Sequence, residues 1–294
     1  MDVIGLLGAG VMGRTIAPRI LNAGYTLLAY DPSPEAQEKI KSMGATLAPD
    51  LLTIAKRANM IILFLPGPSQ VQACVAGPEG LLSAANRGSV IVDMSTVDPA
   101  TSRRMAELAN QRGVAYLDAP VLGRPAAVGA WALPIGGTQR DIERCAPVLN
   151  LFAAKLFHIG GPGAGNKVKL LNQLMFSAIN AMTAEMMAVA EKVGISPKLL
   201  FETIVASQAG TVSNLFKELG ARIAKEDYQN PTFSIDLLCK DVRLAIEMAK
   251  EAKAPPLLAA TIQFANEVAQ AQGLGQKDTA MMWKIFGNLW GSGA

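Results

Sequence analysis

The stretch GLLGAGVMG, residues 5–13, decides how the first half of the chain is expected to fold. It contains Gly8, Gly10 and Gly13 in the spacing G-x-G-x-x-G, directly after an apolar run that predicts a strand over residues 3–7. The motif alone is weak evidence, because glycine-rich turns are common. Between a strand and a helix, however, such glycines permit a tight turn, close approach of a diphosphate and close helix–strand packing. The segment is therefore predicted to bind a dinucleotide at the N-terminus of the following helix.

An acidic residue at the end of the next predicted strand, residues 26–30, indicates which dinucleotide is bound. Asp31 lies near the distance of roughly 20 residues from the glycine motif at which a ribose-binding carboxylate is expected. It should accept hydrogen bonds from the adenosine ribose and repel a 2′-phosphate, and the sequence YDPS places no arginine directly after it. NAD is therefore predicted over NADP. Further residues expected at the cofactor are Ala9, Val11 and Met12 in the motif, and Leu65, Pro66 and Ser69 in the loop LPGPSQ after a later strand.

Strand and helix patterns alternate up to the glycine-rich stretch HIGGPGAG, residues 158–165. This alternation predicts a parallel sheet with helices on both faces. Beyond that stretch the strand signals stop and long helical patterns remain. We therefore expect an α/β Rossmann-type dinucleotide-binding domain over residues 1–162 and an all-α substrate and oligomerisation domain over residues 163–294, joined by a long interdomain helix.

Composition and charge argue against several other classes of protein. The 294 residues carry a formal net charge of +3 without a basic cluster, so nucleic-acid binding is not expected. The apolar region LMFSAINAMTAEMMAVA contains Asn180 and Glu185, which a membrane-spanning helix would tolerate poorly. The N-terminus lacks the basic segment of a secretory signal, and the three cysteines lack metal or redox spacing. These features predict a cytoplasmic protein with reduced thiols and no metal site.

The stretch GAGNKVKLLNQ, residues 163–173, contains the main candidate for proton transfer. Lys169, Asn172 and Gln173 are spaced i, i+3 and i+4 and share one face of the predicted helix, whereas Lys167 points elsewhere. A lysine on a buried helix is costly without a partner or a task. Periodicity alone leaves two interpretations open: a lysine that reaches solvent from a helix end, or a functional group.

Blocks distributed along the whole chain resemble the β-hydroxyacid dehydrogenase family. GLLGAGVMG resembles its opening dinucleotide motif, and GAGNKVKLLNQ resembles its catalytic motif. DMSTVDP and DAPVLGR, residues 93–99 and 118–124, resemble its central substrate motifs, and FSIDLLCKD, residues 233–241, resembles a block that reaches the active site from the helical domain. The resemblance implies an oxidoreductase that transfers a hydride between nicotinamide and a small hydroxy acid or its semialdehyde. It also implies a homodimer or homotetramer.

The same resemblance assigns roles to particular residues. Lys169 takes the place of the lysine that gives or takes the proton on the substrate oxygen, and Asn172 takes that of its orienting partner. Burial would lower the pKa of such a lysine toward the working range. The single histidine, His158, is interpreted as structural, so a histidine-based mechanism is not supported. The resemblance also places Thr96 and Lys240 at the cofactor, and Ser95, Gln173, Phe233 and Asp241 at the substrate, although Lys240 and Asp241 could equally be a solvated pair.

The sequence departs from the family where a serine commonly holds the substrate carboxylate. Here the chain has Leu122, Gly123 and Arg124, followed by a stretch that contains an unusual Trp131. Leu122 cannot donate a hydrogen bond from its side chain, whereas Arg124 can bind a carboxylate, sulfonate or phosphate through two donors. The alternative is that Arg124 is a surface loop residue.

These observations predict an NAD-dependent oxidoreductase that acts on a small anionic 3-hydroxy acid or its semialdehyde, with either a carboxylate or a sulfonate. One alternative is an imine reductase-like enzyme on a similar fold, against which Lys169 argues. Another is a catalytically silent dinucleotide-binding protein, against which Lys169, Asn172 and Asp31 argue together. The substrate and the physiological direction stay open at this point.

Overall fold

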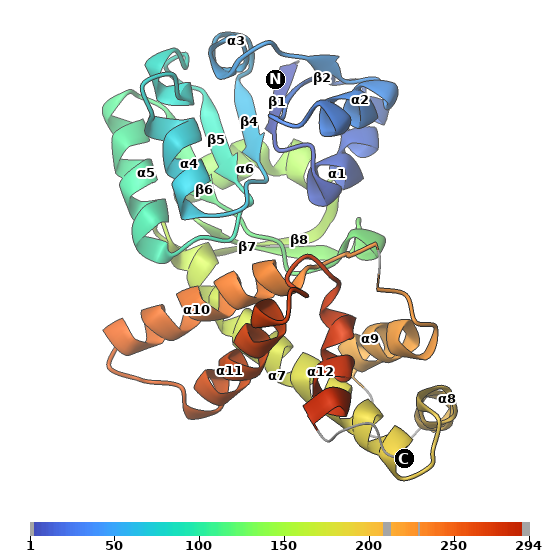
Figure 1. Cartoon of the computed structure of the whole chain (residues 1–294). Coiled ribbons are helices and arrows are strands. Elements are labelled where there is room, and N and C mark those ends of the chain that lie inside the picture. Colours follow the sequence, from blue (N-terminus) through green and yellow to red (C-terminus); the bar gives the residue numbers. More distant parts are fainter. Residues whose placement is uncertain (1–2, 208–212, 229, 290–294) are drawn as a thin grey trace. The chain divides into compact units, whose positions relative to one another are not determined.

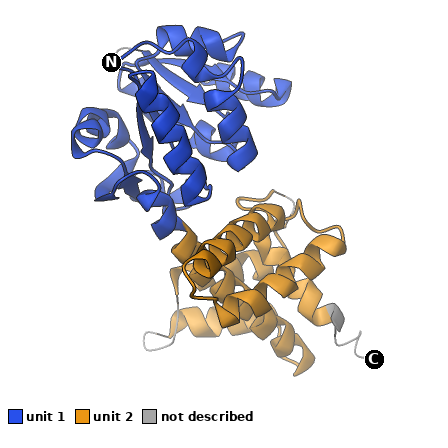
Figure 2. Cartoon of the chain, turned by 90° about the vertical axis from the view of Figure 1, so that its left-hand side faces the viewer, with its two compact units in different colours: residues 1–169 blue, residues 170–294 orange. Residues whose placement is uncertain are grey.

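The computed structural model describes residues 3–207, 213–228 and 230–289 (Figure 1). The chain divides into two compact units, Met1–Lys169 and Leu170–Ala294 (Figure 2). The division falls inside the long helix α7, Ala164–Lys192, so the start of this helix up to Lys169 belongs to the first unit. The sequence-based domain boundary between residues 162 and 163 remains a prediction.

The first unit is built on an eight-stranded sheet in the order β3-β2-β1-β4-β5-β6-β7-β8. Neighbouring strands run parallel, except for the pair β6 and β7. Helices cover both faces of the sheet (Figure 1), which confirms the Rossmann-type fold and the all-helical region after it. The strands are β1 Val3–Leu7, β2 Thr26–Tyr30, β3 Thr46–Leu47, β4 Met60–Leu63, β5 Val90–Asp93, β6 Ala115–Asp118, β7 Trp131–Gly136 and β8 Ala153–Gly160.

Alternating side chains of the central strands supply two separate cores. Ile62 packs with Ile16 on one face of the sheet, while its neighbour Ile61 packs with Ile54 and Val71 on the other. Because both faces are buried, the strand reads as a continuous apolar run. The helices on these faces are α1 Val11–Asn22, α2 Pro34–Ser42, α3 Leu51–Arg57, α4 Pro68–Ala76, the short η1 Leu81–Ser83, α5 Pro99–Gln111, η2 Pro125–Ala127 and α6 Gln139–Leu149.

Three strands and one strand direction differ from the sequence-based expectation. The sequence-based expectation lacks the strands β3, β7 and β8, and it has all strands parallel. No helix longer than the 3₁₀ turn η2 separates β6 from β7 in this fully described stretch, and such a short connection returns the chain antiparallel. The edge strand β8 exposes most of its residues and therefore lacks the apolar pattern of a buried strand.

The second unit continues α7 and packs further helices against it. Met187, Leu219, Ile235 and Met282 are buried together in its main core. Helices α8, α9 and α10 begin at serine caps whose hydroxyls accept hydrogen bonds from the first helical turn. None of the helices in the described ranges is long and apolar enough to cross a membrane. The remaining elements are α8 Pro197–Ala206, α9 Asn214–Ala224, α10 Ile235–Glu251, α11 Leu257–Ala271, η3 Thr279–Met281 and α12 Met282–Leu289.

Candidate active site

The glycine motif forms a turn that other residues could not adopt without displacing the backbone. Gly8 has φ +93°, and a Cβ there would lie 2.1 Å from the carbonyl oxygen of Phe64. A Cβ on Gly13 would lie 2.0 Å from the carbonyl oxygen of Gly8. The turn and the start of α1 therefore pack too closely to admit a side chain at Gly8 or Gly13. This close packing is what the G-x-G-x-x-G spacing predicts.

The space around Gly10 is open, in contrast to the space around its two neighbours in the motif. Among the described residues, none has a side chain that caps α1 at Gly10, and none lies within 4 Å of a Cβ built on that glycine. Val11, the first residue of the helix, is 42% exposed. The first N–H groups of an α-helix have no partner within the helix, so those of Val11, Met12 and Gly13 suit a bound anion. These residues fit the diphosphate of a dinucleotide.

Asp31 is held beside this turn. It follows β2 directly, and its carboxylate accepts hydrogen bonds from the main-chain N–H of Ala9 at 2.7 Å and of Ser33 at 2.9 Å. An ionised carboxylate has further lone pairs available, so these two bonds orient Asp31 without saturating it. The structure therefore brings the acidic residue and the glycine motif together, as the sequence predicts for a ribose-binding site.

The ends of β4 and β5 are joined by a buried polar network. The hydroxyl of Ser95 accepts a hydrogen bond from the N–H of Leu65 at 2.9 Å, and the N–H of Ser95 donates to Asp93 at 2.9 Å. Tyr116 donates to the other oxygen of Asp93 at 2.7 Å, and burial together with this carboxylate raises the pKa of Tyr116 well above its usual value. Ser95 is only 3% exposed, so its contact with a substrate remains a prediction.

Trp131 packs against the loop that follows β6 and holds it by a hydrogen bond. A Cβ on Gly123 would lie 2.2 Å from Cδ1 of Trp131, and the indole N–H donates to the carbonyl oxygen of Arg124 at 2.8 Å. Leu122 forms a backbone bridge with Ala132 at the start of β7. The unusual tryptophan thus fixes the main chain at Arg124, whose side chain is partly buried. Leu122, Gly123 and Arg124 form one ordered turn, and their role in binding substrate remains a prediction.

Lys169 lies near the start of α7, in the same compact unit as the glycine motif. It is partly buried, whereas Lys167 is exposed. Asp118 at the end of β6 and Asn166 at the start of this helix are fully buried, and neither has an individual role in the sequence-based prediction. An aspartate that ends a buried strand was the available signal, because such a group needs hydrogen-bond donors close by.

Five predicted site residues belong to the second unit, and three of them, Gln173, Lys240 and Asp241, are in direct contact. The carboxylate of Asp241 accepts a hydrogen bond from Gln173 at 2.6 Å and forms an ion pair with Lys240 at 2.7 Å. Asp241 is almost completely buried and Lys240 is partly exposed, so these two residues are not a fully solvated pair. Phe233 packs edge-on against Phe176 of α7 at 5.5 Å between ring centroids. Asn172 is exposed on the same helix.

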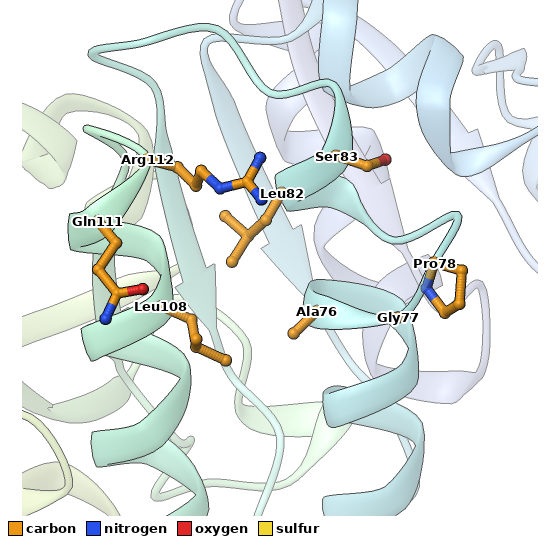
Figure 3. Close-up of a pocket in the computed structure, with 8 residues that line it drawn as sticks. All are labelled: Ala76, Gly77, Pro78, Leu82, Ser83, Leu108, Gln111 and Arg112. Atoms are coloured by element: carbon orange, nitrogen blue, oxygen red, sulfur yellow. The ribbon is translucent and has the colours of Figure 1, made fainter.

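Two further features of the described residues concern metal binding and a pocket outside the predicted site. These residues contain no cluster of histidine, cysteine, aspartate and glutamate that could hold a metal ion. A pocket of about 380 Å³ lies where α4 and α5 end, next to η1 (Figure 3). Both helices begin near the carboxyl ends of strands and run back, so this pocket lies at the opposite edge of the sheet from Asp31 and Ser95. Its lining includes Ala76, Gly77, Leu82, Leu108, Gln111 and Arg112.

Comparisons with known proteins agree over both units. A family model described as the NAD binding domain of 6-phosphogluconate dehydrogenase matches residues 3–160. A second, described as NAD-binding of NADP-dependent 3-hydroxyisobutyrate dehydrogenase, matches residues 163–286. The chain is 31% identical over 290 residues to 2-(hydroxymethyl)glutarate dehydrogenase of Eubacterium barkeri, which covers 98% of this chain and 96% of that protein.

Two further relatives show the same extent of similarity. The chain is 31% identical over 284 residues to 3-sulfolactaldehyde reductase of Escherichia coli (strain K12), with 95% of this chain and 93% of that protein covered. A crystal structure of 3-hydroxyisobutyrate dehydrogenase from Salmonella typhimurium superimposes with a TM-score of 0.90 at 26% identity, with 97% of this chain and 100% of that chain covered. The chain is therefore an NAD(P)-binding oxidoreductase that belongs to the β-hydroxyacid dehydrogenase family.

Proposed function

We propose that this protein transfers a hydride between NAD and a small anionic 3-hydroxy acid or its semialdehyde, with Lys169 as the general acid/base. The observation that carries the proposal is the placement of Lys169, a partly buried lysine at the start of α7, in the unit that holds the glycine motif and Asp31. The only histidine is a poor alternative, because His158 lies on the edge strand β8 and its Nε2 pairs with the carbonyl oxygen of Gly137 at 2.9 Å.

Separate residues are proposed to transfer the proton, to orient the substrate and to bind the cofactor. A bound nicotinamide supplies or accepts the hydride. Lys169 donates a proton to the substrate oxygen in reduction and removes it in oxidation, and its positive charge stabilises the negative charge that develops there. Asn172, one turn further along the same helix face, orients Lys169 and the substrate. The N–H groups at the start of α1 bind the diphosphate.

The preference for NAD rests on Asp31. Its carboxylate is fixed by Ala9 and Ser33 beside the glycine motif, where an adenosine ribose would bind. A 2′-phosphate at that ribose would lie against a negative charge that cannot turn away without losing two hydrogen bonds. One of the matching family models is named for an NADP-dependent enzyme, so the preference needs a direct test in this chain.

The anionic end of the substrate is assigned to Arg124. The bond from Trp131 holds the main chain of Arg124, so a planar donor fork is presented from an ordered turn. Two relatives are named for anionic compounds, a substituted glutarate and a sulfolactaldehyde. Ser95, Leu122 and Gly123 complete this side of the substrate site, and Thr96 together with Leu65, Pro66 and Ser69 contacts the cofactor. In the second unit, Gln173, Phe233 and Asp241 are proposed to bind substrate and Lys240 to bind cofactor.

The assembly is proposed to be a homodimer or homotetramer in the cytoplasm. Leu257, Leu258 and Phe264 of α11 are 85%, 79% and 69% exposed, and apolar side chains of this size favour coverage by a second chain. The three cysteines are free thiols, which agrees with a reducing compartment. Light scattering on the purified protein would measure the number of chains.

A steady-state screen tests the proposed function. NAD reduction is measured with carboxylate and sulfonate alcohols, and NADH oxidation with the matching aldehydes and with a cyclic imine. We expect turnover of an anionic hydroxy acid or aldehyde, and a higher kcat/KM with NAD than with NADP. Turnover of the imine alone would favour the imine reductase alternative, and equal use of NADP would contradict the role of Asp31.

A further inference from the structure

Helix α7 begins at glycines that lie against backbone atoms of α5 and of the sheet. Gly163 has φ +88°, and a Cβ there would lie 2.7 Å from the carbonyl oxygen of Pro99. A Cβ on Gly165 would lie 2.4 Å from the carbonyl oxygen of Pro134 and 2.5 Å from that of Asp118. The space is already filled, so these glycines allow the helix to dock directly on the ends of β6 and β7.

The carboxylate of Asp118 caps this helix from another element. Asp118 is the last residue of β6 and is fully buried. Its Oδ1 accepts a hydrogen bond from the N–H of Gly163 at 2.7 Å, and its Oδ2 accepts one from the N–H of Asn166 at 2.8 Å. These N–H groups at the helix start have no partner within α7, and a negative charge there also interacts favourably with the helix dipole. Two bonds from one rigid group restrict both the position and the rotation of the first turn.

The side chain of Asn166 ties the same turn to a third element. Its Oδ1 accepts a hydrogen bond from the N–H of Val97 at 3.2 Å, and its Nδ2 donates to the hydroxyl of Ser102 at 3.1 Å. Val97 directly follows Thr96, in the segment that is proposed to contact the cofactor. Lys169 lies three residues after Asn166 and therefore on the adjacent part of the helix surface. All these residues belong to the first unit.

We propose that Asp118 and Asn166 are positioning residues that hold Lys169 at the correct distance from the nicotinamide-binding segment. Neither residue is assigned a contact with substrate or cofactor. The carboxylate sets where α7 begins, and the amide sets its distance from the chain after β5. Burial raises the pKa of Asp118 to about 6 despite the hydrogen bonds from Asn166 and Gly163, and this buried charge is costly to keep for packing alone.

The inference rests on the proposed role of Lys169, and a double-substitution cycle tests the two separately. Asp118→Asn should lower kcat on the order of 10–100-fold, because a misplaced catalytic group loses effective concentration. The dissociation constant of NADH should not change, because the diphosphate site lies at α1. In a Lys169→Ala background the same substitution should cause no further loss of the residual kcat. Asp50→Asn, which changes the cap of α3, is the matched control and should leave kcat unchanged.

The outcomes distinguish positioning from a general loss of folded enzyme. An equal fold-loss with and without Lys169 would overturn the inference, because less folded protein lowers both activities alike. Normal turnover of Asp118→Asn would overturn it as well. Normal turnover of Lys169→Ala would instead overturn the proposed function. If Asp118→Asn does not fold, Ser102→Ala removes only the acceptor of the Asn166 amide, and it is expected to lower kcat in the wild-type background but not in Lys169→Ala.

Discussion

Helices α1 and α7 both begin at glycine-rich turns in the first unit, but their first turns have different surroundings. At α1, the space beside Gly10 is open among the described residues, and no described side chain caps the helix. At α7, the space beside Gly165 is filled by backbone, and the carboxylate of Asp118 takes the N–H groups of Gly163 and Asn166. The first turn of α1 is thus open among the described residues, whereas the first turn of α7 is held by Asp118.

The difference shows that glycine spacing alone does not identify an anion site. What separates the two helix starts is whether the free N–H groups already have a partner in the protein. At α7 the carboxylate of Asp118 accepts these N–H groups, as a bound anion would, and it thereby fixes the position of the first helical turn. The proposed roles follow this difference: the first helix start binds the cofactor, and the second sets the position of Lys169.

The largest expected effect concerns the residue that α7 carries. Lys169→Ala should lower kcat on the order of 10²–10⁴-fold, because a positioned proton donor contributes about that much. NADH binding, measured by fluorescence titration, should persist because α1 is untouched. Lys167→Ala changes an exposed lysine two positions earlier and serves as the control. An inactive Lys167→Ala with an active Lys169→Ala would show that the other lysine transfers the proton.

The carboxylate at α7 should also make stability depend on pH. Burial, together with the charge of Asp93, raises the pKa of Asp118 from 3.8 to about 6. The folded protein keeps this proton over a range where the unfolded chain has lost it, so the free energy of unfolding falls as the pH rises from about 4 to about 6. The decrease is at most about 3 kcal/mol, at 1.36 kcal/mol per pKa unit. It is measured as the difference between wild type and Asp118→Asn in chemical denaturation.

The exposed cap of α3 is the control for this pH dependence. Hydrogen bonds from the side chain and the backbone of Thr53 hold the pKa of Asp50 below its ordinary value. Its stabilising contribution is therefore lost as the pH falls, so the difference between wild type and Asp50→Asn should have the opposite slope. A difference for Asp118→Asn that stays constant between pH 4 and pH 6 would contradict the raised pKa.

The sequence was sufficient to predict the glycine turn of α1 beside Asp31, but not the hydrogen bonds that hold the start of α7. The glycine motif and Asp31 interact locally or across adjacent strands, and their spacing is set by a strand–helix–strand unit. Asp118 and Asn166 come from the end of β6 and the start of α7, and they meet only because β7 and β8 intervene in the fold. β8 exposes most of its residues, so a hydrophobic pattern could not reveal it. A pairing that depends on an undetected strand cannot be inferred from residue spacing.

Arg124 is proposed to bind an anion with its side chain, whereas the start of α1 is proposed to bind one with backbone N–H groups. Arg124→Leu should lower kcat/KM for acidic substrates by about one to two decades, since a charge-assisted hydrogen bond contributes roughly 1.5–3 kcal/mol. An uncharged aldehyde of similar size should lose much less, and the KM for NAD should stay the same because the proposed diphosphate site at α1 is unchanged. Equal losses for acidic and neutral substrates would mean that Arg124 only shapes the loop above Trp131.

The smallest expected effect compares the two helix starts directly, through one added methyl group at each. Gly10→Ala places a Cβ in open space at a backbone conformation of φ −66°, so the free energy of unfolding should change by less than about 0.5 kcal/mol. The methyl group would occupy the space through which a diphosphate approaches, so the dissociation constant of NADH should rise about tenfold, or 1.4 kcal/mol.

Gly165→Ala should produce the opposite result. Its Cβ would lie 2.4 Å from the carbonyl oxygen of Pro134, and such overpacking typically costs about 1–3 kcal/mol. The higher helix propensity of alanine offsets at most about 1 kcal/mol of this cost, so the free energy of unfolding should still decrease. NADH affinity of the folded variant should remain normal, since α1 is unchanged. Chemical denaturation and NADH titration of both variants complete the test. If Gly10→Ala bound NADH normally while Gly165→Ala bound it weakly, the roles of the two helix starts would be reversed.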